Sequence, residues 1–315
     1  MAQFFWQKRL TTDNTGQIGI SISKQRLSFA YVKNEGTGEI KLTHLGSICG
    51  AKEAQQTYLK DCVSSLHLQG THATVVLYDK DYQVFLVEQP AVPASEMPKA
   101  IRWLVAEYID FPIEEALVDY IELPQKNNES VKMLYVVVTK KSKVDETVSW
   151  IQAAGLTVKT IDICQSALRQ IALNLENAEE GQALLHLEEE KSYLIIFKNK
   201  TLYMMRDLDL GLNMLSALSE ENAKESVACY QDLSVEIQRS LDYCASKLQN
   251  ANVSRLVITP LQKKRPQLLS NLSNILGLPV REINYTEFMN IKEDVPLKEG
   301  ACVFAIGAAL NQDNL

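Results

Sequence analysis

Short segments rich in apolar, β-branched and aromatic residues predict β-strands in the first part of the chain. Three of them, at 18–23, 26–32 and 39–45, are separated by short polar turns. A helical pattern at about 51–67 and an apolar run at 73–79 come next. Apolar runs and alternations of this length are typical of strands, so the pattern predicts three strands, a helix and a fourth strand.

The same layout recurs about 165 residues further along the chain. The predicted strands lie at 182–188, 192–197, 201–210 and, after helical sequence, 255–260. The step at 198–200, Lys-Asn-Lys, predicts a tight hairpin turn. A repeated unit of three strands, helix and strand indicates two α/β lobes related by duplication, which is the architecture of the actin and sugar-kinase fold. We expect the lobes at 1–180 and 181–315.

Three helices between these strands have clear amphipathic patterns. In the first, the apolar residues fall on one face: Met97, Ala100, Ile101, Leu104, Val105 and Tyr108. Ser95 is the expected N-cap of this helix, with Pro98 in its first turn. A second helix is expected to start at Ser142, with Asp145 at the capping-box position, and to end at Gly155. The third covers about 231–248.

Composition and charge exclude some classes of protein. The 315 residues are 46% hydrophobic and 23% charged, and the net charge is -7. An acidic balance gives no electrostatic footprint for nucleic acid. The short basic run 263–265 is either a solvated turn or a contact with a membrane surface or phosphate.

The six cysteines and four histidines show no zinc-ligand spacing, so no metal site is expected. Cysteines on apolar faces without a disulfide pattern favour a reducing compartment. The N-terminus lacks the order of a signal peptide, and the longest apolar run, 301–310, is about half of a membrane span. We therefore expect a protein that stays inside the cell.

Several segments resemble the PilM family, the actin-like component of type IV pilus assembly. They are VPASEMPKAIRWLVAEYIDFPIEEALVDYIELP at 92–124, YVVVTKKSKVDETVSWIQAAGLTVKTIDICQSALRQIA at 135–172, EIQRSLDYCASK at 236–247 and AIGAAL at 305–310. They occur in the family's order and cover most of the chain. Within the family the chain looks closest to the MshI branch, which serves mannose-sensitive haemagglutinin pili.

The resemblance implies a two-lobed actin-like fold with an inserted α+β subdomain at about 80–140. Family members lie at the cytoplasmic face of the inner membrane. They bind the short N-terminal tail of a PilN-like membrane protein, which links the inner complex to the motor platform. The tail is expected in a groove between the insert and the first lobe, held by strand addition or side-chain pockets. Trp103, Tyr108 and Phe111 either line that groove or anchor the insert's helix to its sheet.

Actin-like folds bind nucleotide at two hairpin turns and an adenine-side turn, which need Gly, small residues and an acidic magnesium ligand. Here the first turn reads Ser-Ile-Ser-Lys-Gln at 21–25, the second His-Leu-Glu-Glu-Glu-Lys at 186–191, and the third Thr-Pro-Leu-Gln at 259–262. Each departs from the pattern of the fold. The remnant site comprises Ser21, Ser23, Lys24, Glu188 and Gly307, and we expect it to be degenerate, with no cofactor.

The alternative is retained binding of ATP with Mg²⁺. In that case Glu188 or Glu189 replaces the missing aspartate and Lys24 contacts a phosphate. The simpler interpretation of 188–190 is a solvated hairpin tip, and of Lys24 a solvated turn residue.

The N-terminal aromatics Phe4, Phe5 and Trp6, next to Lys8 and Arg9, either contact a membrane or partner or form a packed or frayed terminus.

No Gly-rich phosphate loop or nucleophile elbow is present. Three functions remain: a pseudo-ATPase scaffold without catalytic residues, a nucleotide-switched ATPase and an actin-like filament. The altered turns favour the scaffold over the ATPase.

Overall fold

The computed structural model describes residues 16–34, 39–124, 132–175, 180–216, 223–247, 252–261, 265–295 and 299–311. The expected contact segment at 4–9 lies outside these residues, as do Lys263 and Lys264 of the basic run. Packing divides the chain into two compact units. The first comprises Met1–Gln170, Met289–Leu297 and Phe304–Leu315, and the second Ile171–Phe288 and Lys298–Val303. The expected boundary at 180/181 stays a prediction.

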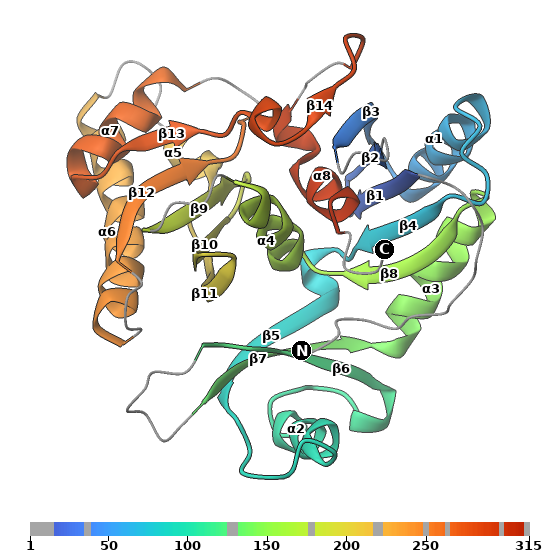
Figure 1. Ribbon diagram of the computed structural model, residues 1–315, viewed down its shortest axis with the longest axis horizontal. Helices are drawn as coiled ribbons and strands as arrows, with labels where there is room; N and C mark the ends of the chain where they lie inside the picture. Colours follow the sequence, from blue (N-terminus) through green and yellow to red (C-terminus); the bar gives the residue numbers. More distant parts are fainter. Residues whose placement is uncertain are drawn as a thin grey trace. The chain divides into compact units, whose positions relative to one another are not determined.

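The first unit contains a six-stranded sheet in the order β14-β3-β2-β1-β4-β8 (Figure 1). Its strands are β1 (Gly16–Ile22), β2 (Arg26–Asn34), β3 (Ile40–Cys49), β4 (His72–Val76), β8 (Thr157–Asp162) and β14 (Asn290–Ile291). Neighbours β1, β2 and β3 are antiparallel, whereas β1, β4 and β8 are parallel.

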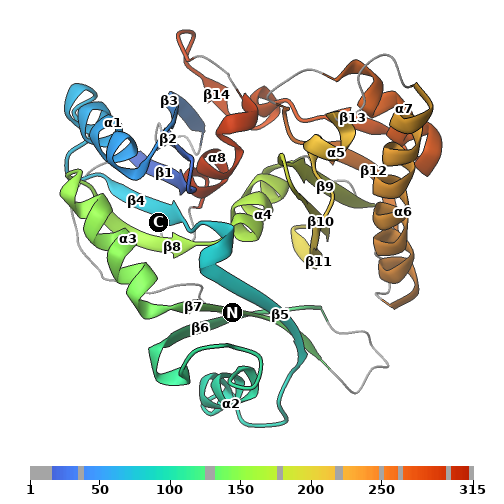
Figure 2. The same cartoon turned by 180° about the vertical axis from the view of Figure 1, so that it is seen from behind.

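Helices lie on both faces of this sheet (Figures 1 and 2). They are α1 (Lys52–Ser65) and α3 (Lys141–Ala153) on one face and α8 (Val303–Ala309) on the other. Leu59 of α1 and Ile151 of α3 join Ile18, Ile20 and Val75 of the strands in one buried cluster. The alternation of apolar residues along β1 therefore directs Ile18 and Ile20 to the face that α1 and α3 cover.

The second unit repeats the plan, with the strand order β11-β10-β9-β12-β13. The chain passes from the first unit to the second within α4 (Cys164–Asn174). The elements that follow are β9 (Gly181–Leu187), β10 (Ser192–Lys198), β11 (Thr201–Leu208), α5 (Leu212–Ser216), α6 (Ala223–Lys247), β12 (Val253–Ile258), α7 (Pro266–Leu276) and β13 (Val280–Glu282). The antiparallel trio β9, β10 and β11 and the parallel β9, β12 and β13 match the five strands β3-β2-β1-β4-β8 of the first sheet, which has β14 in addition. The predicted duplication is confirmed.

A separate three-stranded sheet, the insert, interrupts the first unit between β4 and α3. It comprises β5 (Tyr82–Glu88), α2 (Met97–Val105), β6 (Ala116–Glu122) and β7 (Met133–Lys140), with the strand order β5-β7-β6. Met97, Ile101 and Val105 of α2 pack on Val136 and Val138 of β7 in its core. The predicted α+β insertion is therefore present.

Two predicted N-caps are wrong. Helix α2 begins at Met97 with Glu96 as its N-cap, and α3 begins at Lys141 with Ser142 inside its first turn; neither N-cap side chain caps its helix. In α3 the reason is that β7 runs directly into the helix, so the last strand residue, Lys140, takes the cap position. The predicted end at Gly155 is correct, because this residue has a φ of 91° directly after the C-cap of α3.

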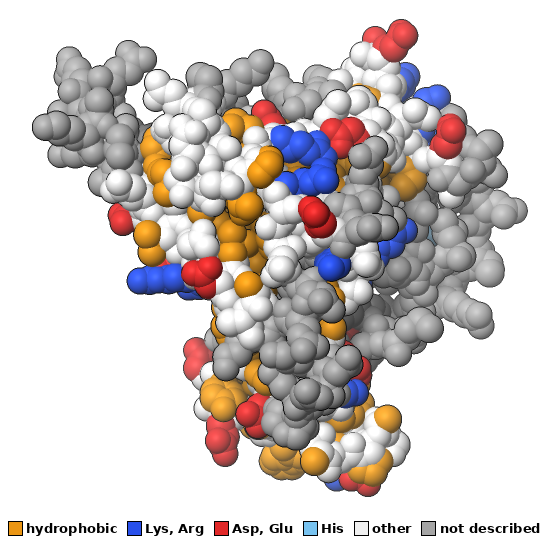
Figure 3. Space-filling view, turned by 60° about the vertical axis from the view of Figure 1, so that its left-hand side comes forward, with side chains coloured by type: hydrophobic (Ala, Val, Ile, Leu, Met, Phe, Trp, Pro, Cys, Tyr) orange, Lys and Arg blue, Asp and Glu red, His pale blue; other side chains and the backbone are white. Residues whose placement is uncertain are grey.

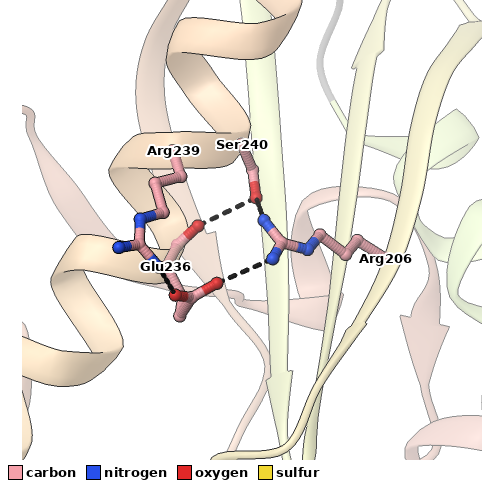
Figure 4. A network of polar contacts seen from close by, with 4 residues as sticks. All are labelled: Arg206, Glu236, Arg239 and Ser240. Atoms are coloured by element: carbon pink, nitrogen blue, oxygen red, sulfur yellow. Dashed lines mark hydrogen bonds and ion pairs between the residues drawn. The ribbon is translucent and has the colours of Figure 1, made fainter.

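Polar contacts attach α6 to the edge strand β11 (Figure 4). Arg206 of β11 donates to Glu236 at 2.7 Å and to the Ser240 hydroxyl at 2.9 Å. Arg239, one turn from Glu236 on α6, pairs with the same carboxylate. One acidic side chain thereby holds two guanidinium groups, one from each element.

The turn between β10 and β11 has the tight form predicted. Asn199 and Lys200 have φ values of 48° and 61°, which is the two-residue turn that suits the twist of a hairpin. A lysine in the left-handed region costs about 1 kcal/mol that glycine avoids.

We expect Lys200→Gly to stabilise the second unit by about 0.5–1 kcal/mol, because it relieves this backbone strain. Lys198→Gly, two residues away in β10, is the matched control and should destabilise by about the same amount. Chemical denaturation of both variants measures the difference. Destabilisation by both would contradict the turn geometry.

Candidate functional site

The β1–β2 turn, where the fold would hold a phosphate, is closed by its own groups. Ser23 N–H donates to the Arg26 carbonyl at 2.8 Å, and Arg26 N–H donates to the Ser23 hydroxyl at 3.0 Å. The Gln55 side chain of α1 donates to the Ser23 carbonyl at 3.2 Å. Lys24 is exposed at the tip. The amide and hydroxyl of Ser23 are thus engaged within the chain.

The β9–β10 turn is engaged in a similar way. Glu188 N–H donates to the Lys191 carbonyl at 2.9 Å and closes the turn. The first amides of α5, those of Leu212 and Asn213, donate to the carbonyls of Glu188 and Glu189 at 2.8 and 2.9 Å. A Cβ at Gly211 would collide with the Glu189 and Glu190 backbone, so glycine is what allows α5 to approach so closely.

His186 stands where the resemblance places the magnesium-organising aspartate. Its ring is buried, with Nδ1 2.7 Å from the Thr259 hydroxyl and Nε2 3.4 Å from a Glu188 carboxylate oxygen. The ring also stacks on Tyr193. Residue 259 belongs to the adenine-side turn, so this hydrogen bond links two of the three turns; the fourth residue of that turn, at 262, lies outside the described part. A neutral or cationic ring at this position cannot organise Mg²⁺ as a carboxylate does.

Gly307, the fifth predicted remnant residue, lies in α8 against α4. A Cβ there would collide with the Ala167 carbonyl of α4, and one at Gly19 of β1 would collide with the backbone of α8 at Ala305 and Ala309. The two glycines let α8 lie directly on the strand and on the neighbouring helix. Gly307 therefore has a packing role in this structure.

Ser21 lies in the same row of the sheet as Asp162, which is not among the predicted site residues. It pairs with Val76 of β4, which in turn pairs with Asp162 of β8, so the three form one row of the sheet. Asp162 is fully buried, and burial raises the pKa of its carboxyl to about 6. The only signal in the sequence was an aspartate at the end of a strand before a helix, a position where the parallel strands of an α/β sheet present ligand-binding residues.

The insert exposes large apolar side chains. Trp103 of α2 is 65% exposed, Tyr108 just past the helix 56%, and Leu86 of β5 44%. The Tyr108 ring lies 5.6 Å from that of Phe85, whereas Phe111 is half-buried in the insert's core with Lys140 Nζ 4.7 Å from its ring centre. In Figure 3 the lowest part of the molecule, which the insert forms, shows hydrophobic side chains at its surface.

Acidic side chains outnumber basic ones in the described part of the insert. The described part of the insert carries Glu88, Glu96, Glu107, Asp110, Glu114, Glu115, Asp119 and Glu122 against Lys99, Arg102, Lys132 and Lys140. Its sheet ends in two edge strands, β5 and β6. On β6 the Tyr120 amide donates to the Asp119 carboxylate at 2.7 Å, which shields that edge from further pairing.

Within the described residues, no helix is both long and apolar enough to cross a membrane. The same residues include no group of three or more His, Cys, Asp or Glu side chains placed to hold a metal ion.

Comparison with known proteins supports the resemblance found in the sequence. Residues 83–218 match the family model of the type IV pilus assembly protein PilM. Among solved structures, a PilM–PilN type IV pilus biogenesis complex matches with a TM-score of 0.69 and 20% identity, over 93% of this chain and 97% of that chain. The cytoplasmic domain of EpsL, an inner-membrane component of the type II secretion system of Vibrio cholerae, matches with a TM-score of 0.50 and 13% identity, over 92% and 94%. No curated protein matches the sequence.

These matches show the fold, which is the predicted one: an α/β, two-lobed actin-like architecture with an α+β insert in its first lobe. The similarity to PilM is confirmed for 83–218, a range that includes nearly all of the insert.

We expect Gly307→Ala to destabilise the first unit by about 2 kcal/mol, because the added methyl must displace the α4 backbone. Gly50→Ala is the control: its Cβ would lie 3.3 Å from the exposed Ala54 side chain, and the change should stay within about 0.5 kcal/mol. Thermal unfolding compares the two. Equal effects would exclude the close helix contact.

Proposed function

We propose that this protein is a cytoplasmic scaffold of the type IV pilus assembly platform, which binds the N-terminal cytoplasmic tail of a PilN-like membrane protein. The observation that carries the proposal is the exposure of the aromatic side chains Trp103 and Tyr108 on the insert, within the range that matches PilM; Leu86 of β5 is also exposed. The solved PilM–PilN complex with the same fold names the class of partner.

The chemistry of this surface suits an extended tail with apolar and basic residues. Exposed aromatic side chains are typical anchors of a protein interface. The acidic side chains around them attract a cationic peptide and speed its association. Of the insert's two edge strands, β5 carries Leu86 and lies next to Tyr108, so a tail added along β5 would reach the aromatic anchors.

We further propose the MshI branch of the family, which serves mannose-sensitive haemagglutinin pili, as the finer placement. Support comes from the sequence segments at 92–124, 135–172, 236–247 and 305–310, which resemble the family. Binding to a PilN-like protein and to other platform and motor components would hold the chain at the cytoplasmic face of the inner membrane.

The nucleotide site is proposed to be degenerate, which makes the protein a pseudo-ATPase. Support comes from the turns: the Ser23 amide closes its own hairpin, α5 occupies the carbonyls of Glu188 and Glu189, and His186 replaces the expected carboxylate. A bound phosphate would have to replace these internal hydrogen bonds, each contributing about 1 kcal/mol.

Trp103→Ala should weaken binding of a synthetic peptide with the N-terminal sequence of the organism's PilN-like protein by about tenfold or more, because an exposed aromatic anchor is removed. Calorimetry on the full chain measures the dissociation constant. Tyr243→Ala, which removes an aromatic side chain 42% exposed on α6, is the control and should leave it unchanged. Saturable binding of the peptide that neither substitution alters would indicate that the docking site lies outside the insert.

Titration with ATP and Mg²⁺ should give no binding heat in the same instrument. Clear binding would instead support the alternative, a nucleotide-switched ATPase of the same machinery. In that event Lys24→Ala and Glu188→Ala should each weaken it, since they are the exposed charged groups of the two phosphate turns. Pelleting of the protein by centrifugation only in the presence of nucleotide would indicate a filament.

A further inference from the structure

Asp162 is a buried carboxylate for which the proposed function has no use. Its Oδ1 accepts a hydrogen bond of 2.8 Å from the Ile163 amide, and Oδ2 lies 3.4 Å from the side-chain amide of Asn311. The Ser166 side chain is a third hydrogen-bonding partner. The carboxylate therefore contacts the beginning of α4 and Asn311, the second residue after the end of α8.

These two helices are where the chain passes between its units. The boundary falls between Gln170 and Ile171 inside α4, and between Val303 and Phe304 at the start of α8. Asp162 itself belongs to β8 of the first unit, as do its partners Ser166 and Asn311. One side chain thus ties both connecting helices to the first sheet.

The end of α8 is also held by Gln17 of β1. Its side-chain amide donates to the carbonyl of Asn311 at 2.8 Å, with the Ala308 carbonyl at 3.4 Å and the Thr74 hydroxyl at 2.8 Å. The last carbonyls of a helix lack partners within the helix, so this amide caps α8. Gln17 and Asp162 therefore both bind Asn311, Gln17 at its backbone carbonyl and Asp162 at its side-chain amide, and Gln17 also reaches α8 itself at Ala308.

Few charges surround this cluster. Of the described charged groups, Arg169 of α4 is the one whose charge bears on Asp162, and it favours the ionised form. No Lys or Arg of the described residues forms an ion pair with the carboxylate. Of the neighbouring residues, Ser166 and Asn311 bond the carboxylate and Val76 pairs with Asp162 in the sheet, and none of these three side chains titrates.

We propose that Asp162 is a proton-sensitive fastener of the two connecting helices, holding the end of α8 more firmly when it is protonated than when it is ionised. An ionised carboxylate that is sealed from water gains hydration when α8 opens. A protonated one gains little, and it can donate a hydrogen bond to Asn311 once that amide has rotated.

The direction and size of the pH effect follow from the linkage between proton binding at Asp162 and the closing of α8. Burial raises the pKa of Asp162 from 3.8 to about 6, so the closed state binds the proton more tightly than an opened, hydrated state. The group's contribution to closing is fully present below pH 3.8 and is lost as the pH rises through about 6. Between pH 5 and pH 8, protection of the α8 amides should therefore fall about tenfold.

Hydrogen exchange of α8 in the full chain tests this between pH 5 and pH 8, after division by the intrinsic exchange rate. The wild type should show the tenfold fall, and Asp162→Asn should show a flat profile. Asp145→Asn, which neutralises an exposed carboxylate on α3, is the control and should follow the wild type. A tenfold fall that persists in Asp162→Asn overturns the proposal.

Asn311→Ala provides a second, independent variant if Asp162→Asn does not fold. It leaves the carboxylate in place but cuts its link to α8. Protection of α8 should then be nearly independent of pH, while the midpoint of thermal unfolding still varies with pH. An unchanged pH profile of α8 in this variant would likewise reject the fastener.

Discussion

The direct contact of the α8 backbone with β1 and α4 is the constraint on which much of the first unit depends. Gly19 on the strand and Gly307 on the helix leave out the side chains that would hold these backbones apart. Because α8 lies so close, Gln17 reaches the carbonyls at its end and Asn311 reaches Asp162. A single methyl group at either glycine would displace the helix and, with it, the polar cluster.

That cluster keeps a carboxylate away from water. Ionising Asp162 in the folded chain costs about 3 kcal/mol relative to the hydrated group, from the difference between 3.8 and about 6 in pKa. A neutral residue of the same shape would avoid this cost. Proteins retain such groups mainly where the charge has a use, which agrees with a role at the two helices that join the units.

The turns of the two lobes and the insert differ in which groups they leave exposed. In the turns, the amides of Ser23 and Glu188 donate to carbonyls of the same hairpins, and the carbonyls of Glu188 and Glu189 accept from α5. In the insert, the small core buries one side of α2 and leaves Trp103 and Tyr108 in water. The exposed aromatic side chains of the insert therefore contrast with the two turns, in which several backbone groups are bonded within the chain.

Local patterns in the sequence were sufficient for the duplication, the Asn199–Lys200 turn and the end of α3 at Gly155, because each depends on periodicity or on the conformation of one or two residues. The sequence also showed that the three turns lack the residue types expected at the nucleotide-binding turns of the fold, because this comparison needs only the residue types at known positions. The starts of α1 and α2 were close to those predicted, but the N-cap of α3 was not the predicted one, because β7 runs straight into this helix and no local signal marks where the strand becomes a helix. Nor could the pattern show that α5 binds the second turn, that His186 bonds Thr259 across 73 residues, or that Asp162 meets Asn311 across 149. Those contacts form only when distant segments are brought together by packing, and their energies depend on the burial that packing creates.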